Sequence, residues 1–218
     1  MPAAANDCVV RPAATAGARQ PDEGTGAGRE AASASEVRRL LDAALELIHV
    51  GGAGARPRVA DIVAAAGLSN DAFYRHFPSK DALIAALIED GAERLVSYVA
   101  HRMAKARTPE GAVRAWVEGV LSQADDGTAT TTRAVLWNAG ALPPEHATVS
   151  SHPDARLAAL LLGPLTELGS AAPEFDATLI AHAVVGRLTD HLWDRGQPTV
   201  DDIDRVTAFC LRSVTRQE

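Results

Sequence analysis

The stretch that decides the fold is Ala66-Gly-Leu-Ser-Asn-Asp-Ala-Phe-Tyr-Arg-His-Phe-Pro-Ser-Lys80. Gly67 can take the left-handed conformation that ends a helix, and the Ser69 hydroxyl can cap the start of the next one. Residues from Asn70 onward favour one or two helical turns, which end at Phe77 because the residue before Pro78 avoids the helical conformation. Two short helices joined by a tight turn that contains glycine form a helix-turn-helix.

Upstream of this turn, the sequence predicts two further helices. Ser33-Ala-Ser-Glu36 has the form of a capping box, which predicts that the first helix begins there. The residues that follow include an apolar set at helical spacing, namely Val37, Leu40, Leu41, Ala44, Leu45 and Ile48. After Gly51-Gly-Ala-Gly54, a short helix is expected from Arg58 to Ala66.

The N-terminal segment is expected to be a disordered tail. Residues 1–32 contain ten alanines, four glycines and three prolines and show no apolar periodicity. Burial of such a segment cannot offset the entropy lost on ordering it.

Downstream, the sequence predicts only helices. Ser79-Lys-Asp81 opens a long amphipathic helix to about residue 106, and further helices are expected over 109–124, up to about 139, 153–168, 174–195 and 200–216. No stretch alternates polar and apolar residues, so strands are not expected. The predicted fold is all-α with about nine helices, divided into a helix-turn-helix domain at 33–79 and a larger helical domain at 80–218.

Composition excludes several classes of protein. The 218 residues are 47% hydrophobic and only 4% aromatic, which is typical of a globular protein with an aliphatic core. The longest strongly apolar run, Leu157–Leu162, is far shorter than the roughly 20 residues of a membrane span, and no signal peptide is recognisable. The two cysteines lie at opposite ends of the chain and predict neither a disulfide framework nor a zinc site. We therefore expect a cytoplasmic protein.

The second helix of a helix-turn-helix lies in the major groove of DNA, with its first residues facing the bases. Here those residues are Asn70, Asp71 and Ala72. Asparagine can bind adenine, aspartate can accept from cytosine N4, and alanine can contact a thymine methyl group. These three residues are the predicted base contacts.

Three further residues are predicted to contact phosphates. Tyr74 and His76 follow on the same helix, and Lys80 lies where the next helix begins, so that free amides and the helix dipole also favour an anion. Tyr74 can alternatively be a packing residue, because its neighbours Phe73 and Phe77 are expected to lie in the core.

Four motifs carry a resemblance to a known family: Arg38-Arg-Leu-Leu-Asp-Ala-Ala44, Val59-Ala-Asp-Ile62, Ala66-Gly-Leu-Ser69 and Phe73-Tyr-Arg-His-Phe-Pro-Ser-Lys80. With them, residues 35–90 resemble the DNA-binding domain of the TetR family of bacterial transcription regulators. The resemblance implies DNA contacts by Ser69, Tyr74, His76 and Lys80, and adds Arg38, Arg39 and Arg58 as backbone contacts. Arginines 38 and 39 can also simply be a solvated helix face.

Charge predicts selective rather than general DNA binding. Residues 35–90 carry six Lys and Arg against eight Asp and Glu, a local charge of −2, and the whole chain has a formal charge of −7. Asp71 also stands where many members of the family have glycine. We therefore expect weak affinity for non-specific DNA.

By resemblance, the helices after residue 106 are expected to enclose a small-molecule pocket. The candidates for ligand binding are Trp116, Trp137, Asn138 and His182, because a mostly apolar pocket usually contains a few fixed polar groups. The alternatives are that the tryptophans are packing residues, that Asn138 caps a helix and that His182 lies on the surface.

The last two helices are expected to form a homodimer interface, with small residues Ala183 and Gly186 allowing close approach. Such a dimer would hold two recognition helices about one DNA turn apart, roughly 34–36 Å. The alternative is that both helices complete a monomeric core.

Together these features predict a dimeric repressor that binds a palindromic operator and is released by a small-molecule effector, with repression implied by the family alone. The rival interpretations are a helical ligand-binding protein or enzyme that has lost operator binding, and an interaction scaffold. Neither a nucleotide fingerprint, nor metal-ligand spacing, nor a nucleophile elbow is present, so we expect no enzyme activity, metal or cofactor.

Overall fold

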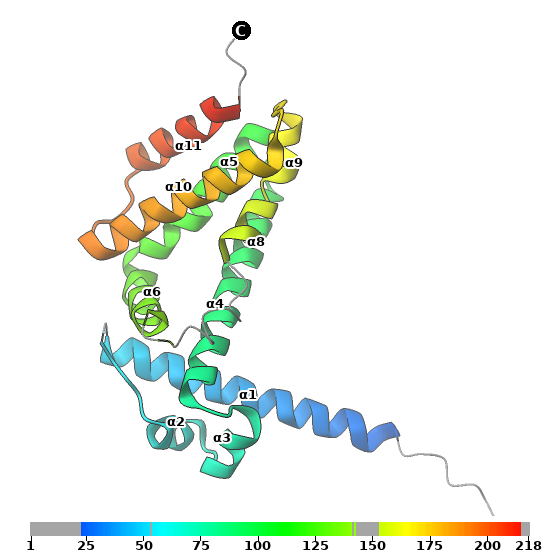
Figure 1. The fold of residues 1–218 in the computed structure, drawn as a ribbon, viewed down its shortest axis with the longest axis vertical. Helices are drawn as coiled ribbons and strands as arrows, with labels where there is room; N and C mark the ends of the chain where they lie inside the picture. Colours follow the sequence, from blue (N-terminus) through cyan, green and yellow to red (C-terminus); the bar gives the residue numbers. More distant parts are fainter. Residues whose placement is uncertain (1–22, 53, 141, 143–152, 215–218) are drawn as a thin grey trace, which may run out of the picture. The chain divides into compact units, whose positions relative to one another are not determined.

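The structure is a computed structural model that describes residues 23–52, 54–140, 142 and 153–214 (Figure 1). Over these ranges the chain is helical and contains no strand, which confirms the all-α prediction. There are ten α-helices and one 3-10 turn in the described parts, where about nine helices were expected. Internal contacts divide the chain into two compact units, Met1–Ser35 and Glu36–Glu218.

The first helix begins earlier than predicted. Helix α1 spans Glu23–Gly51, so Ser33 lies inside it and does not start it. The side chains of residues 28–35 are all exposed. Residues 23–32 contain three alanines, which favour a helix, but also three glycines, which disfavour it, so helix propensity alone does not account for the earlier start. The rest of the predicted tail, residues 1–22, lies outside the described residues.

The helix-turn-helix packs around a hydrophobic core of its own. Helices α2 (Val59–Ala66) and α3 (Asn70–His76) pack with the second half of α1 and the first turns of α4 (Lys80–Met103). Phe73 and Phe77 are both buried, with ring centroids 5.8 Å apart, as expected of core residues. The largest fully buried side chains of this cluster are Leu40, Ile48, Ile62, Phe73 and Leu83.

The turn between α2 and α3 has the predicted geometry. Gly67 is left-handed, with φ 63° and ψ 38°, and Leu68 donates its amide to the Val63 carbonyl at 2.9 Å. Ser69 then caps α3 by accepting the Ala72 amide at 3.1 Å. These contacts fix the angle at which α3 leaves the turn.

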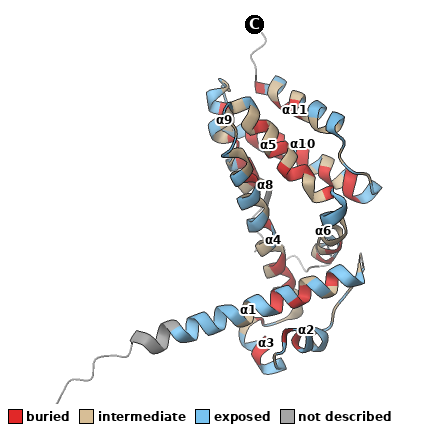
Figure 2. Ribbon diagram, turned by 180° about the vertical axis from the view of Figure 1, so that it is seen from behind, coloured by how far each residue is buried: buried red, intermediate tan, exposed pale blue. Residues whose placement is uncertain are grey.

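The remaining helices form a second core. They are α5 (Pro109–Leu121), the 3-10 turn η1 (Ser122–Ala124), α6 (Asp126–Ala139), α8 (Pro153–Ala159), α9 (Leu162–Glu167), α10 (Pro173–Asp194) and α11 (Val200–Val214). Figure 2 shows buried residues concentrated along α5 and α10, which pack against each other and supply most of this core. None of the helices in the described ranges is long and apolar enough to cross a membrane.

The single helix predicted over 153–168 is wrong. The structure contains α8 and α9 instead, separated by a turn at Leu160 and Leu161. Pro164 explains the break, because it has no amide to donate and its ring would clash with the Leu160 carbonyl in a continuous helix.

Candidate nucleic-acid interface and ligand cavity

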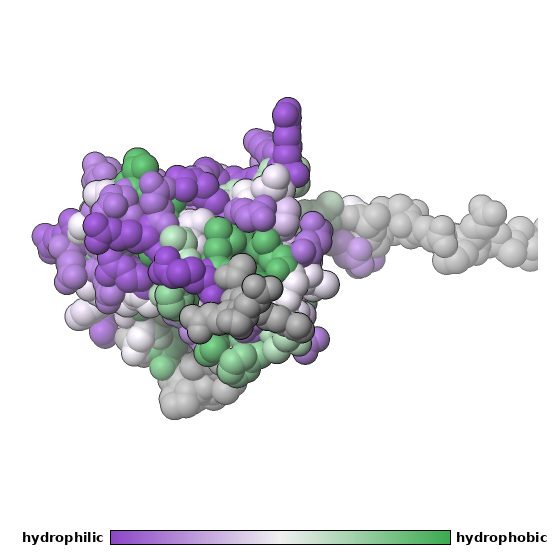
Figure 3. Space-filling model, turned by 90° about the horizontal axis from the view of Figure 1, so that it is seen from above, coloured by the Kyte–Doolittle hydropathy of each residue, from purple (hydrophilic) through white to green (hydrophobic). Residues whose placement is uncertain are grey.

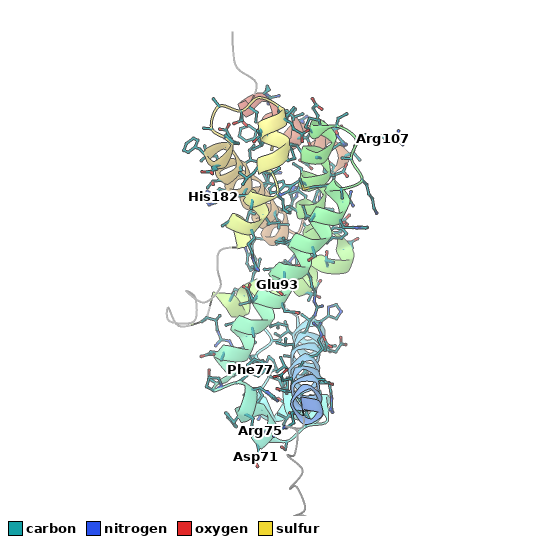
Figure 4. All side chains as sticks on the ribbon, turned by 90° about the vertical axis from the view of Figure 1, so that its right-hand side faces the viewer. Asp71, Arg75, Phe77, Glu93, Arg107 and His182 are labelled. Atoms are coloured by element: carbon teal, nitrogen blue, oxygen red, sulfur yellow. The ribbon has the colours of Figure 1, made fainter. Side chains whose placement is uncertain are left out.

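One side of the recognition helix α3 is exposed. Asn70, Asp71, Tyr74 and Arg75 all lie on it. The Tyr74 ring packs edge-on against Phe73, with centroids 5.2 Å apart, and 58% of the residue is still exposed. Figure 4 shows Asp71 and Arg75 on the outward side of the helix. Ala72 is different: it is buried with 3% exposure, so its methyl group does not face a thymine.

Arg75 is a candidate DNA contact that the sequence interpretation missed. Its side chain is 64% exposed, and its guanidinium lies 3.4 Å from Glu36 Oε2 on α1. The sequence spacing could have identified it, because Arg75 lies four residues after Asp71 and therefore on the same side of the helix.

His76 is held by α1. Its Nε2 and Glu36 Oε2 are hydrogen-bonded at 2.7 Å, and only 11% of the His76 side chain is exposed. This hydrogen bond, with the nearby charges of Arg75, His76 and Arg39, lowers the pKa of Glu36 against a smaller effect of desolvation. His76 therefore has little surface left for a phosphate, and its predicted DNA contact stays a prediction.

Lys80 is the first residue of α4, after the N-cap Ser79, whose hydroxyl accepts the Ala82 amide at 3.1 Å. Among the described residues Lys80 has no ion-pair partner. An ammonium group beside the first free amides of a helix can bind an anion together with them. The Ser69 hydroxyl, by contrast, is already occupied as the cap of α3.

The three arginines predicted as backbone contacts differ in their surroundings. Arg38 pairs with Asp42 at 2.8 Å and Asp90 at 2.9 Å, and the hydrogen bond to Asp42 raises its pKa above the ordinary arginine value. Arg39 donates to the Gly67 carbonyl at 3.0 Å and also to that of Ala66.

Arg58 alone points into solvent, with 87% of its side chain exposed and Asp61 3.7 Å away. The structure therefore leaves Arg58 available to a phosphate, whereas Arg38 and Arg39 are engaged within the protein.

A cavity of about 540 Å³ is lined by residues of both hydrophobic cores. Its walls come from α4, α5, η1, α6, α8 and α10 and include Leu45 of α1, and most of its lining is aliphatic. This volume is within the usual range for pockets that bind drug-sized molecules, about 300–1,000 Å³.

The four residues predicted to bind ligand do not line this cavity. Trp116 is fully buried, with its indole donating to the Leu157 carbonyl at 2.9 Å. Asn138 is buried and donates to two backbone carbonyls. Trp137 is 49% exposed, and its ring centroid is 6.4 Å from that of Trp193.

His182 is exposed and lines a separate, smaller cavity of about 250 Å³ together with Asp154, Ala155 and Thr178. Within the described ranges no group of three or more acidic, histidine or cysteine residues could hold a metal ion. The larger cavity was missed because its walls come from segments distant in the sequence, which only packing brings together.

The exposed side of α3, the capped turn before it and Lys80 at the start of α4 define a helix-turn-helix DNA-binding regulator. The family model for bacterial regulatory proteins of the tetR family matches residues 40–87. This match confirms the resemblance of the helix-turn-helix segment to the DNA-binding domain of that family.

Solved structures share the fold across most of the chain. A protein described as a tetR-type transcriptional regulator from Streptomyces avermitilis is 22% identical, covering 82% of this chain and 97% of that one, with a TM-score of 0.65. A TetR transcriptional regulator from Rhodococcus sp. RHA1 is 19% identical over 84% of this chain and 98% of that one, with a TM-score of 0.61.

The structure of the superantigen PfiT is also similar, with 18% identity, coverage of 84% and 97%, and a TM-score of 0.61. At these identities the likeness concerns the fold, which by itself does not fix a function. No curated protein sequence matches the chain.

Proposed function

We propose that this protein is a ligand-responsive transcriptional repressor that binds a palindromic operator as a homodimer. The observation that carries the proposal is the exposed side of α3, where Asn70, Asp71, Tyr74 and Arg75 stand clear of the core. Asn70 and Asp71 would contact bases, while Tyr74, Lys80 and Arg58 would contact phosphates. Repression rather than activation rests on the family alone.

The dimer rests on an exposed apolar face. Phe175, Leu179 and Trp193 are 64%, 51% and 46% exposed and, with Gly186, fall on one side of α10 at helical spacing. Phe209 of α11 is 50% exposed. Figure 3 shows apolar surface among polar surface at the end of the molecule that carries α9 and α11. Large exposed apolar side chains that gather on one face are typical of protein interfaces.

The effector would bind in the 540 Å³ cavity. The two DNA-binding domains of the dimer would have one arrangement that fits the operator and another that does not. The effector would bind the second arrangement more tightly and so shift the equilibrium toward it. Trp137, Asn138, Trp116 and His182, which do not line the cavity, are not included in this site.

Selection from randomised duplex DNA tests the proposal. The enriched sequence would be titrated by fluorescence anisotropy at two salt concentrations. A palindromic consensus with an affinity that falls steeply with salt would support an operator-binding dimer. A folded protein that enriches nothing, in the absence of any co-purified ligand, would favour the second candidate, a helical ligand-binding protein without an operator, which the cavity supports.

A further inference from the structure

The charged groups in the lining of the 540 Å³ cavity restrict the ligand it can take. Asp90, Arg94 and Asp154 are the lining residues that carry a charge at neutral pH. Arg94, which is the single cation among them, lies 2.5 Å from Asp90 Oδ2 and 3.8 Å from Asp42 Oδ1.

Asp90 is itself shared, because Arg38 of α1 donates to its other oxygen at 2.9 Å. Arg38, Arg94, Asp42 and Asp90 thus form a neutral network of two cations and two anions. An anionic ligand would have to take Arg94 from these carboxylates. These carboxylates already balance the charge of Arg94, so the lining offers an anion no unpaired cation.

The third charged group in the lining, the Asp154 carboxylate, also disfavours an anionic ligand. Asp154, in the first turn of α8, has no ion-pair partner among the described residues, so the lining carries a net negative charge. Its carboxylate is in the preferred position near a helix N-terminus and needs no ligand to stabilise it. An anion in the cavity would therefore be repelled without a compensating cation.

The polar groups that remain for a ligand are uncharged. The hydroxyl groups of Thr128, Thr131 and Thr189 already have partners within the protein. Gln123 and Thr132 also line the cavity, and neither side chain has a hydrogen-bond partner in the part of the chain that the structure describes. A hydroxyl or carbonyl group on a ligand can bond to either of them.

We infer that the cavity selects an uncharged, largely apolar molecule that carries one or two hydroxyl or carbonyl groups and excludes carboxylates. The aliphatic walls bind its body, and Gln123 and Thr132 bind its polar group. This inference rests on the proposed effector site, but it concerns ligand binding alone and holds whether or not the protein binds an operator.

Three probes of equal chain length test it: decan-1-ol, decanoate and decylammonium, titrated calorimetrically into the full-length protein at pH 7.5 without DNA. Decan-1-ol is expected to bind with one molecule per chain, at least tenfold more tightly than decanoate. Tighter or equal binding of decanoate, tightest binding of decylammonium, or binding of none of the three would overturn the inference.

Variants locate the binding site. Thr132→Val and Gln123→Leu each remove one hydrogen-bonding group and are expected to weaken decan-1-ol binding about three- to tenfold. Thr130→Val on the same helix, at a residue that does not line the cavity, is the matched control and should leave binding unchanged. Equal affinities for all three variants and the wild type would place the ligand elsewhere and overturn the assignment.

Operator binding is measured separately from these titrations. Selective binding of decan-1-ol by a protein without operator affinity would contradict the proposed function and leave the ligand class standing. Operator binding with no preference for decan-1-ol would support the proposed function and contradict the ligand class.

Discussion

Asn138 on α6 donates a hydrogen bond to the carbonyl of Ala55, 83 residues away in the sequence, at 3.1 Å. Its amide also donates to the Ala134 carbonyl at 2.9 Å. Ala55 belongs to the loop between α1 and α2, so a helix that lines the 540 Å³ cavity is bonded to the loop that precedes the helix-turn-helix. His49 and Thr131 make a second such bond, at 2.5 Å between Nδ1 and Oγ1.

Removing this amide should destabilise the protein. Asn138→Ala leaves the Ala55 carbonyl without its partner, and we expect a loss of about 1–3 kcal/mol in the free energy of unfolding, measured with urea. Trp137→Phe, at the half-exposed neighbouring residue, should change stability by less than about 0.5 kcal/mol. Equal effects of both substitutions would show that the Asn138 bond contributes no more than an ordinary surface contact.

Replacing Gly67 and Gly91 by alanine should change the stability of the protein in opposite directions. Gly67 has φ +63°, and a methyl group there would also lie 3.0 Å from Arg39 Nη2, so Gly67→Ala should cost about 1–2 kcal/mol. Gly91 lies within α4, and a methyl group added to it would meet nothing within 4 Å, so Gly91→Ala should stabilise by up to about 1 kcal/mol. Thermal unfolding of both variants checks the pair, and destabilisation by both would contradict the assignment.

The predicted base and phosphate contacts should differ in kind. Lys80→Ala should weaken binding to all DNA sequences alike and reduce the salt slope by about one, because one phosphate contact is lost. Asp71→Ala should instead change the preferred sequence. Anisotropy titrations of operator and scrambled duplexes at several salt concentrations measure both effects. If the two variants weakened binding uniformly, Asp71 would not contact a base.

A charge on the apolar side of α10 should break the dimer. Leu179 is 51% exposed, and Leu179→Glu would place a carboxylate in the proposed interface, so sedimentation at micromolar concentration should show mainly monomer. Val50→Glu, at a 76% exposed valine of α1, is the control and should remain dimeric. Dissociation of neither variant, or of both, would remove α10 from the interface.

The contact between Glu36 and His76 should make stability depend on pH. The pKa of Glu36 is lowered in the folded protein, chiefly by its hydrogen bond to His76, so the folded state favours the carboxylate. Its contribution is therefore complete above the pKa of the unfolded chain and is lost as the pH falls through the lower, folded value.

Urea unfolding of the wild type and Glu36→Gln at pH 7 and at successively lower pH values tests this. The wild type should be more stable at pH 7, and the difference should vanish in acid. A difference that persisted unchanged in acid would assign the effect to packing rather than charge.

Local signals in the sequence predicted the helix-turn-helix because its geometry depends on neighbouring residues. Gly67, Ser69 and Pro78 each act within one helical turn, and the structure places α2 and α3 accordingly. The start of α1 was predicted too late, because the capping pattern at Ser33 lies inside a helix that begins at Glu23.

The candidate sites were less predictable, because residue type does not reveal direction. Ala72 and Asn70 are two residues apart, yet the first is buried and the second exposed. Trp116 and Asn138 have the chemistry of ligand contacts, but their polar groups bond to backbone carbonyls. The cavity depends on the packing of several helices, which no local pattern contains.

The positions of the three tryptophans allow fluorescence to report on the larger helical part of the protein without the helix-turn-helix. Trp116, Trp137 and Trp193 all follow residue 80, so the helix-turn-helix has no indole and is silent in tryptophan fluorescence. Trp116 is fully buried, whereas Trp137 and Trp193 are about half exposed. A soluble quencher would therefore reduce the fluorescence of Trp137 and Trp193 and leave that of Trp116 unchanged. Unquenched emission would then follow the integrity of the core around Trp116, and circular dichroism would follow all the helices. Any gap between the two melting curves would measure how far the DNA-reading part unfolds on its own.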